Sequence, residues 1–433
     1  MQRYRILIAS ALVVFTLSAL TSRLLSHKSK DSTQKVGTAI STTEKTSKNK
    51  RDALLYTTRQ KELQTALNVY FKKAIAKGDV IGAGVSIVKG DSIIISEGFG
   101  KKNSAEQSTV NGETVFRLGS LSKGFAGILA ANIKSEGKLN WTDKVSDYLP
   151  EFQLGDGTNT SNVTLANILS HTSGTPYHSY TNLVEAGLPL KDIAKRFKEV
   201  MPISKPGLMY SYQNAMFALC GEMMKKATGK KINTLLDNRF FKPLEMCATT
   251  TDYETLTHEA NIAMPHVKTR NGWKAAHLKD NYYNAVAAGG ISSNAHDMGR
   301  WMRFLLGHHP EVMKSEAIDE AFNPFIEISG HRKYYQRWPG HTRSYYGFGW
   351  RIHKFTEGDS TFEKTIWHHG GSVNNYRNEI AVYPEADLGI CVLMNNNSPL
   401  AKTVIPDLYE IVKAVYSQAT PKELHHQIAA TTL

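Results

Sequence analysis

Ordered structure is first predicted from about residue 56. There, hydrophobic and polar positions alternate with a helical period and then with a strand-like period. Leu63, Leu67 and Phe71 recur every four residues between polar ones, which is the spacing of one apolar helix face. Gly78 ends this predicted helix. The next stretch, VIGAGVSIVKGDSIIISEGFG, has two runs rich in β-branched residues around a Lys-Gly-Asp turn. It predicts a β-hairpin.

The rest of the pattern predicts one sheet built from both ends of the chain. A mostly helical stretch runs to about residue 344, and the strand-like runs YGFGWRIHKF, KTIWHHGGS, YRNEIAVYP and DLGICVLMNN follow before a last helix near 402–415. Strands at both ends with helices between them indicate an α/β protein of the α+β kind. We expect one domain at 56–433, composed of a sheet subdomain (about 56–115 and 345–419) and an all-helical subdomain (about 116–344).

The N-terminus carries an export signal. The basic start MQRYR is followed by a 15-residue apolar run from Ile6 to Leu20, shorter than the roughly 20 residues of a comfortable membrane span. The run fits the core of a signal peptide, whereas the poor cleavage site at Ala19-Leu20-Thr21 leaves a retained anchor equally open. We expect residues 1–25 to be one of these two and 26–55 to be a disordered polar tether. The protein is then exported, either periplasmic or anchored to the outer side of the cytoplasmic membrane.

The net charge does not indicate a nucleic-acid partner. Of the formal +13, the first 51 residues carry +8 and the other 382 carry only +5. A mildly basic body says little about the ligand, so we expect no nucleic-acid binding. The three cysteines are too few and too scattered for a disulfide framework or a metal site. Cys220 and Cys391 lie in apolar segments, which predicts core positions.

One basic and aromatic segment has two interpretations. The stretch HRKYYQRWPGHTRSYY, from His331 to Tyr346, has four Arg or Lys, four Tyr and one Trp without an acidic residue. Such interleaving can bind a glycan, a membrane surface or a single-stranded nucleic acid. We favour the alternative, a loop that packs its aromatic rings on the helical subdomain and leaves its charges in water.

Ser120 and Lys123 form the first candidate catalytic pair. The spacing Ser-x-x-Lys is weak evidence alone, because it occurs five times in the chain. Only Ser120 stands where a strand-like run meets a long apolar helix. A serine in the first helical turn faces the positive end of the helix dipole. Lys123 projects from the same helix face, which is the arrangement of an activated nucleophile and its proton partner.

Tyr212 and Asn214 form the second candidate element. The pattern Tyr-x-Asn occurs four times, but here a Pro206-Gly207 turn precedes it and an amphipathic helix ending at Gly229 follows. Asn214 can instead be only a helix N-cap. A tyrosine beside a lysine ammonium can have a lowered pKa and act as a general base, which is the role that Tyr212 requires.

The third element is His369-Gly370-Gly371, on a predicted strand whose glycines allow close backbone approach by a substrate. His368 and His369 can instead be metal ligands. No further histidine or carboxylate at zinc-site spacing accompanies them. We therefore expect no metal and no other cofactor.

In combination, these elements resemble the serine β-lactamases and penicillin-recognising hydrolases, and especially the branch of class C β-lactamases with its DD-peptidase and esterase relatives. The order is SLSK, then Tyr-x-Asn after Pro-Gly, then a basic residue-x-Gly near the C-terminal strands. The segments TLANILSHTSGTP, AAGGISSNAHDMGRWM and YGFGWRI also resemble that branch, so that the likeness runs from about Leu63 to Val415. The resemblance implies an antiparallel sheet flanked by helices plus a helical subdomain, with the active site between the two subdomains.

The resemblance also implies a role for each candidate. Ser120 is the acylated nucleophile, Lys123 its proton partner and Tyr212 the general base. Asn214 binds the substrate amide, and His369 stands at the family's cationic position. The loop segment from His171 to Gly174 has a structural role. The backbone N–H groups of Ser120 and Ser372 form the oxyanion hole beside Gly371.

One departure affects the expected substrate. The family's β-lactamases have Lys-Thr-Gly where this chain has His369-Gly370-Gly371. An unperturbed histidine is mostly neutral at pH 7, and the threonine hydroxyl is missing. We therefore expect a D-amino-acid peptidase, carboxypeptidase-like enzyme or esterase acting on a peptide, an ester or a β-lactam-like small molecule, with cell-wall peptide as one candidate. The alternatives are a weak class C-type β-lactamase and a catalytically silent binding protein.

Overall fold

The computed structural model describes residues 53–358 and 360–417. The predicted signal or anchor segment, and all but the last residues of the predicted tether, lie outside the described residues. Residues 63–416 form one compact unit, and the elements below belong to it. Among the described residues, no helix combines the length and the apolarity that crossing a membrane requires.

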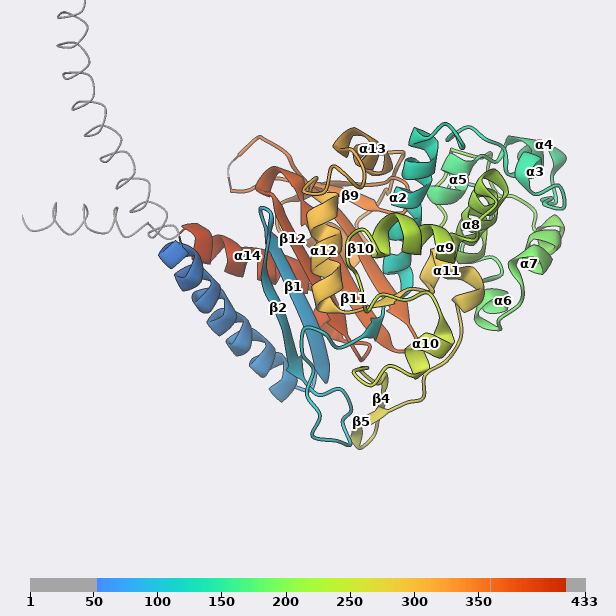
Figure 1. Ribbon diagram of the computed structural model, residues 1–433. Coiled ribbons are helices and arrows are strands. Elements are labelled where there is room, and N and C mark those ends of the chain that lie inside the picture. Colours follow the sequence, from blue (N-terminus) through green and yellow to red (C-terminus); the bar gives the residue numbers. More distant parts are fainter. Residues whose placement is uncertain (1–52, 359, 418–433) are drawn as a thin grey trace, which may run out of the picture. The chain divides into compact units, whose positions relative to one another are not determined.

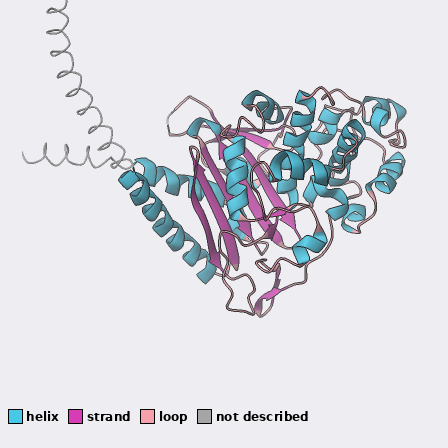
Figure 2. Ribbon diagram, viewed as in Figure 1, coloured by secondary structure: helices cyan, strands magenta, loops and turns pink. Residues whose placement is uncertain are grey.

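The core of this unit is an eight-stranded antiparallel sheet (Figure 2). The predicted hairpin is confirmed and supplies two neighbouring strands at one edge, and the C-terminal strands complete the sheet. Its strands, in spatial order, are β2 (Ser92–Gly100), β1 (Gly82–Lys89), β12 (Leu388–Met394), β11 (Tyr376–Tyr383), β10 (Lys364–Val373), β9 (Arg351–Phe355), β8 (His341–Tyr346) and β7 (Ile326–Glu327).

Helices cover both faces of the sheet (Figure 1). Strand β12 reads LGICVLM, apolar throughout, because alternate side chains enter two different cores. Ile390 and Val392 pack in one cluster with the helical residues 63–76 and α14 (Val404–Ser417). Cys391 and Leu393 pack in the other cluster with α2 (Ser122–Ser135) and α12 (Ala295–Leu305). Cys220 and Cys391 are buried, as predicted.

Most of the smaller helices gather around α2, beside the sheet (Figure 1). In chain order the smaller helices are α3 (Val145–Tyr148), α4 (Gly157–Asn162), α5 (Leu165–Leu169), α6 (Thr181–Glu185), α7 (Leu190–Arg196), α8 (Asn214–Thr228), α9 (Ile232–Leu236), α10 (Tyr253–Thr257), α11 (Val286–Gly289) and α13 (Ser315–Asp319). All of them except α4 and α10 contribute side chains to the core that contains α2.

The segment at 116–344 is not all helical, which corrects the predicted division. It contains the pairs β3 (Phe116–Arg117) with β6 (Ser292–Ser293) and β4 (His266–Thr269) with β5 (Gly272–Ala275). Strands β7 and β8 also precede or overlap residue 344, and both belong to the main sheet. The short strands lack the long alternating runs that a sequence pattern can reveal, and their partners lie far away in the chain.

The basic and aromatic segment 331–346 is not entirely a loop, although its four Arg and Lys side chains are exposed, as expected. It contains the 3-10 turn Tyr334–Arg337, and its last six residues form β8. Tyr346 contacts His171 and Tyr210 of the helical part, as expected, whereas Tyr335 and Trp338 are buried in the core that contains α14. Pairing of β8 with β9 explains the difference, because it brings the segment onto the sheet.

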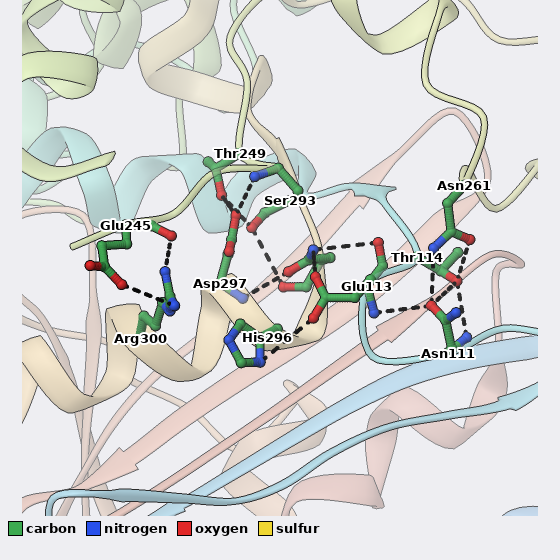
Figure 3. Close-up of polar contacts among 12 residues, drawn as sticks. Asn111, Glu113, Thr114, Glu245, Thr249, Asn261, Ser293, His296, Asp297 and Arg300 are labelled. Carbon is green, nitrogen blue, oxygen red and sulfur yellow. Dashed lines mark hydrogen bonds and ion pairs between the residues drawn. The ribbon is translucent and has the colours of Figure 1, made fainter. Parts of the chain in front are cut away.

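A polar network fixes the start of α12 (Figure 3). Asn294 caps the helix by accepting a hydrogen bond from Asp297 N at 2.7 Å. Asp297 in turn accepts from Ala248 N and Thr249 Oγ1 at 2.9 and 2.8 Å. Arg300 forms an ion pair with Glu245 at 3.1 Å. These contacts hold the loop after residue 244 against the sheet-covering helix.

Candidate active site

Ser120 lies in a short 3-10 turn that leads directly into α2. The turn spans Gly119–Leu121, and α2 begins at Ser122. Gly119 has a φ of +57°, a conformation that glycine adopts without strain. A Cβ atom at Gly119 would lie 2.9 Å from the backbone N and C of Ser372 on β10. The backbone carrying the serine therefore rests directly on the strand that supplies the other predicted oxyanion donor.

Lys123 is fully buried beneath Ser120, on the face of α2 that turns inward. Its Nζ lies 2.7 Å from Asn214 Oδ1, 2.7 Å from the Ala288 carbonyl oxygen and 3.2 Å from Ser120 Oγ. Burial, followed by the nearby charge of Arg351, holds the pKa of Lys123 well below its ordinary value. A neutral amine has two N–H donors for the two short contacts, and its lone pair then faces the serine hydroxyl.

Tyr212 approaches Ser120 from the opposite side. Its hydroxyl donates to Ser120 Oγ at 2.9 Å. The expectation of a lowered pKa is wrong: burial raises the pKa of Tyr212, and the charges of Arg351 and Arg377 only partly oppose this effect. Of the two groups, only Lys123 thus has a lowered pKa, and Tyr212 is a neutral hydrogen-bond donor.

Asn214 is the first residue of α8, and its side chain is buried. The N-cap position is occupied by Gln213, so that the capping interpretation of Asn214 is wrong. Its Oδ1 accepts from Lys123, and its Nδ2 donates to Tyr282 Oη at 3.0 Å. The predicted partner of a substrate amide is therefore already engaged with Lys123, although it lines the cavity described below.

His369 lies on β10, as predicted, but it is not the expected cation. The ring is fully buried, and its Nε2 lies 2.9 Å from Tyr346 Oη. Burial, then the charge of Arg351, holds the pKa of His369 well below its ordinary value, so the ring is neutral. Tyr346 Oη also lies 3.2 Å from His171 Nε2, whose Nδ1 accepts from Gln213 N at 3.1 Å. These buried contacts connect β10 to the start of α8.

Gly371 keeps β10 close to the segment that carries Ser120. A Cβ atom at this position would lie 2.1 Å from the Leu118 carbonyl oxygen and 2.7 Å from Leu121 Cδ1. Only a residue without a side chain permits this approach. The following residue, Ser372, lines the same cavity as Ser120. The structure thus brings the predicted residues Ser120, Lys123, Tyr212, Asn214, Gly371 and Ser372 together.

A cavity of about 420 Å³ opens above Ser120. Most of its wall is polar or aromatic, and it gathers residues from the helical part and from the sheet. The lining side chains and backbone belong to Ser120, Tyr177, His178, Thr181, Glu185, Tyr210, Tyr212, Asn214, Tyr282, Lys333, Tyr334, Tyr335, Arg351, Gly370, Ser372 and Arg377.

Sequence reasoning missed the cations of this cavity. Arg351, Arg377 and Lys333 line it, and none of them was among the predicted site residues. Among the described residues, Arg351 Nε and Nη1 are buried without a hydrogen-bond partner. The available signals were the segment YGFGWRI, which contains Arg351, and the segment from His331 to Tyr346, which contains Lys333. Neither motif indicated that the charges converge beside Ser120.

The metal interpretation of the paired histidines finds no support in the geometry. His368 Nε2 lies 2.8 Å from Glu379 Oε2, and His368 Nδ1 lies 3.0 Å from His353 Nε2. Both ring nitrogens are therefore engaged with protein groups. In the part of the chain that the structure describes, there is no group of three side chains suited to hold a metal ion.

The chain is similar to known proteins over most of its length. The family model described as Beta-lactamase matches residues 67–412. The chain is 23% identical over 354 residues to Protein flp of Staphylococcus aureus (strain COL), covering 80% of this chain and 66% of that protein. It is 25% identical over 338 residues to Unguisins hydrolase ungD' of Aspergillus campestris, covering 76% and 60%. The chain therefore spans slightly less than two thirds of the length of these relatives.

The fold also matches a solved structure. The octameric penicillin-binding protein homologue from Pyrococcus abyssi superimposes with a TM-score of 0.69 at 22% sequence identity. The match covers 80% of this chain and 77% of that chain. This likeness confirms the predicted arrangement of an antiparallel sheet and helices.

Proposed function

The chain belongs to the beta-lactamase family and has its fold, and from this premise we propose that it hydrolyses an amide or ester through an acyl-enzyme on Ser120. The observation that carries the proposal is the set of three contacts of Lys123 Nζ with Asn214, Ala288 and Ser120. A buried lysine with a depressed pKa is a general base at neutral pH.

The first half of the reaction forms the acyl-enzyme. Lys123 Nζ takes the proton of Ser120 Oγ while the oxygen bonds to the substrate carbonyl carbon. The carbonyl oxygen becomes an oxyanion, which the N–H groups of Ser120 and Ser372 stabilise. When the tetrahedral intermediate collapses, the bond to the leaving nitrogen or oxygen breaks. Tyr212 Oη donates a proton to that leaving group and regains one from the Lys123 ammonium through a water molecule.

The second half of the reaction hydrolyses the acyl-enzyme, with water in place of Ser120 as the nucleophile. A water molecule attacks the ester carbon of the acyl-enzyme and loses its proton to the neutral Lys123. The bond between the carbonyl carbon and Ser120 Oγ breaks, and the serine oxygen takes the proton back from the Lys123 ammonium. The free acid leaves, and the resting arrangement of Lys123, Tyr212 and Ser120 is restored.

For the substrate, we propose a short peptide or an ester that carries a carboxylate. Arg351 supports this choice, because its buried guanidinium borders the cavity and lacks an acidic partner among the described residues. An arginine is well suited to bind a carboxylate. Arg351 on β9 therefore supplies the positive charge that His369 lacks. This weakens the sequence argument that the chain does not hydrolyse β-lactams. A carboxypeptidase-like activity fits best, and the relative named as an unguisins hydrolase supports hydrolysis in general.

The cellular setting belongs to the same proposal. The basic and apolar N-terminus supports export to the periplasm or to the outer side of the cytoplasmic membrane. Peptides of the cell wall are then accessible substrates. The alternative of a catalytically silent binding protein has less support, because Lys123, Tyr212 and Asn214 all point at or connect to the nucleophile.

The experiment that tests the proposal is intact-mass measurement of the full chain after incubation with a fluorophosphonate and, separately, with a penicillin. We expect a fluorophosphonate adduct in the wild type that is lost in Ser120→Ala. A persistent penicilloyl adduct would favour peptidase chemistry, and its rapid turnover would favour a β-lactamase. Absence of any adduct in the folded wild type would contradict the acyl-enzyme and favour the binding protein.

A further inference from the structure

A buried carboxylate lies directly behind the active-site strand. Glu379 on β11 is opposite Gly370 on β10 and is fully buried. Three groups contact its two oxygens: Arg377 Nη2 at 2.9 Å, His368 Nε2 at 2.8 Å and Tyr334 Oη at 2.8 and 3.0 Å. Two of these groups, Arg377 and Tyr334, also line the cavity above Ser120. A change in Glu379 therefore reaches the substrate site through its direct partners.

Gly370 makes room for this arrangement. A Cβ atom at Gly370 would lie 2.6 Å from Tyr334 Oη and 2.9 Å from Glu379 Oε1. Any side chain here would displace the tyrosine or the carboxylate. The β-lactamases of this family have a threonine at this position. In this chain, Tyr334 and Glu379 occupy the space that a side chain would take.

Glu379 is also one end of a continuous hydrogen-bonded chain. His368 Nδ1 lies 3.0 Å from His353 Nε2, and His353 Nδ1 lies 2.8 Å from Ser344 Oγ. Ser344 Oγ lies 2.6 Å from His341 Nε2, and His341 is half-buried at the other end. The chain therefore runs along three neighbouring strands, from β10 through β9 to β8.

The protons of this chain can all point in one direction. Burial holds the pKa values of His368, His353 and His341 below their ordinary range, so each ring is neutral and carries one N–H. Each neutral ring can donate toward Glu379 and accept from the next member, with the Ser344 hydroxyl as a link. A proton taken up at His341 Nδ1 can therefore be passed on link by link until it reaches Glu379.

We propose that Glu379 is a specificity-determining residue of the active site, which controls whether Arg377 is available to a substrate carboxylate. As a carboxylate, Glu379 holds Arg377 in an ion pair. As a carboxylic acid, protonated through the chain from His341, it leaves the guanidinium free for the substrate. This inference rests on the proposed function, because it deepens the carboxylate recognition assigned there.

Glu379 titrates in the physiological range. Burial raises its pKa to about 7, although Arg377, Tyr334 and Arg351 act in the opposite direction. The titratable and charged groups that face it are Tyr334 from the 3-10 turn, His368 from β10, Arg351 and His353 from β9, Cys391 from β12 and Arg377 on its own strand. Below about pH 7 the pocket therefore gains one uncompensated positive charge, and binding of an anionic substrate becomes tighter.

The test compares two matched esters, one ending in a carboxylate and one in a carboxamide, as substrates of the full chain. The readout is the ratio of their KM values, which cancels effects on the chemical step that the two esters share. In the wild type, we expect the preference for the carboxylate ester to fall about tenfold from about pH 5.5 to about pH 8.5. In Glu379→Gln we expect the preference to stay at its low-pH value throughout. A wild-type preference that does not change with pH, or one that changes equally in Glu379→Gln, would overturn the proposal.

A second measurement tests the proposal without measuring catalysis and without depending on the folding of a single variant. Infrared difference spectra of the full chain between these pH values should show the carbonyl band of a protonated carboxyl group, lost in Glu379→Gln and retained in Tyr334→Phe. After a pH jump, the band should rise more slowly in Ser344→Ala, which breaks the chain. Equal rates in wild type and Ser344→Ala would exclude the relay.

The failure of this inference and the failure of the proposed function are distinguishable. In Ser120→Ala, calorimetry can measure the Kd of the carboxylate ester without turnover. A Kd that rises with pH, in a protein whose wild type hydrolyses neither ester, would refute the proposed function and retain the role of Glu379. Hydrolysis with a KM ratio independent of pH would do the reverse.

Discussion

Asn214 Oδ1 lies 2.7 Å from Lys123 Nζ, and this contact joins the first turn of α8 to the buried face of α2. Together with the Ala288 carbonyl oxygen, also at 2.7 Å, it fixes two directions of the amine. The direction that remains points to Ser120 Oγ at 3.2 Å. The neighbours of Lys123 thus decide both its charge and the aim of its lone pair, and the predictions about the base follow from this relationship.

Asn214→Asp should move the acidic limb of the pH profile of kcat/KM to higher pH. In the wild type, burial depresses the Lys123 pKa, so the neutral base persists toward lower pH. A carboxylate in contact with Nζ favours the ammonium and raises that pKa. We expect activity at neutral pH to fall about 10- to 100-fold and to recover toward alkaline pH. Asn214→Ala adds no charge and is the control. An acidic limb that does not move in Asn214→Asp would exclude Lys123 as the titrating base.

Lys123→Arg should abolish most of the activity, although it keeps a nitrogen-bearing side chain at this position. A guanidinium does not lose its proton in proteins, so it cannot accept the proton of Ser120. We expect kcat/KM for an ester to fall by about 10²- to 10⁴-fold, the usual contribution of a positioned base. Lys268→Arg, on the exposed part of β4, is the matched control. A Lys123→Arg enzyme with near wild-type activity would show that only the charge matters.

Tyr212→Phe should lower kcat while leaving the acidic limb in place. The change removes the hydroxyl that donates to Ser120 Oγ and with it the proton donor to the leaving group. We expect a loss of about 10²-fold or more for an amide, and less for an activated ester whose leaving group needs no proton. Tyr210→Phe, which alters a second tyrosine of the same cavity, is the control. If the acidic limb disappears in Tyr212→Phe, the base is Tyr212 and not Lys123.

Arg351→Gln should weaken carboxylate recognition selectively. The variant retains a polar side chain and removes the charge that lines the cavity. We expect KM for a carboxylate ester to rise about 10- to 100-fold, and KM for the matched carboxamide ester to change much less. Arg343→Gln, at an exposed ion pair with Glu363, is the comparison variant. Equal effects on the two esters would mean that Arg351 supports the pocket without binding the carboxylate.

Glu379→Gln should flatten the pH dependence of stability between about pH 4.5 and about pH 7. The folded-state pKa of Glu379 is raised from 4.5 to about 7, so the folded state binds this proton more tightly than the unfolded state. Its contribution is complete below the unfolded pKa and is lost as pH rises through 7. Relative to Glu379→Gln, the wild-type free energy of unfolding should fall by roughly 3 kcal/mol across this window.

Urea unfolding at several pH values measures this difference. Glu327→Gln, an exposed position on β7, is the control for a generic loss of negative charge. Parallel pH dependences in wild type and Glu379→Gln would show that Glu379 keeps the same charge in the folded state throughout this range.

The sequence alone determined the elements that local patterns encode. The helical spacing of Leu63, Leu67 and Phe71, the hairpin and the strand with His369 all appear where predicted. The placement of Ser120 before α2 and of Asn214 at the start of α8 also follows from local signals. These features depend on residues that are close in the sequence and on the spacing of hydrophobic positions, and both can be read directly from the sequence.

Only the tertiary structure decided the charges of the site. The pKa of Lys123 is depressed and that of Tyr212 is raised because residues distant in the sequence bury both groups. Arg351 and Arg377 replace His369 as the cations because β9 and β11 bring them to one cavity beside Ser120. Desolvation and Coulomb interactions depend on three-dimensional distance, so no local motif could reveal them.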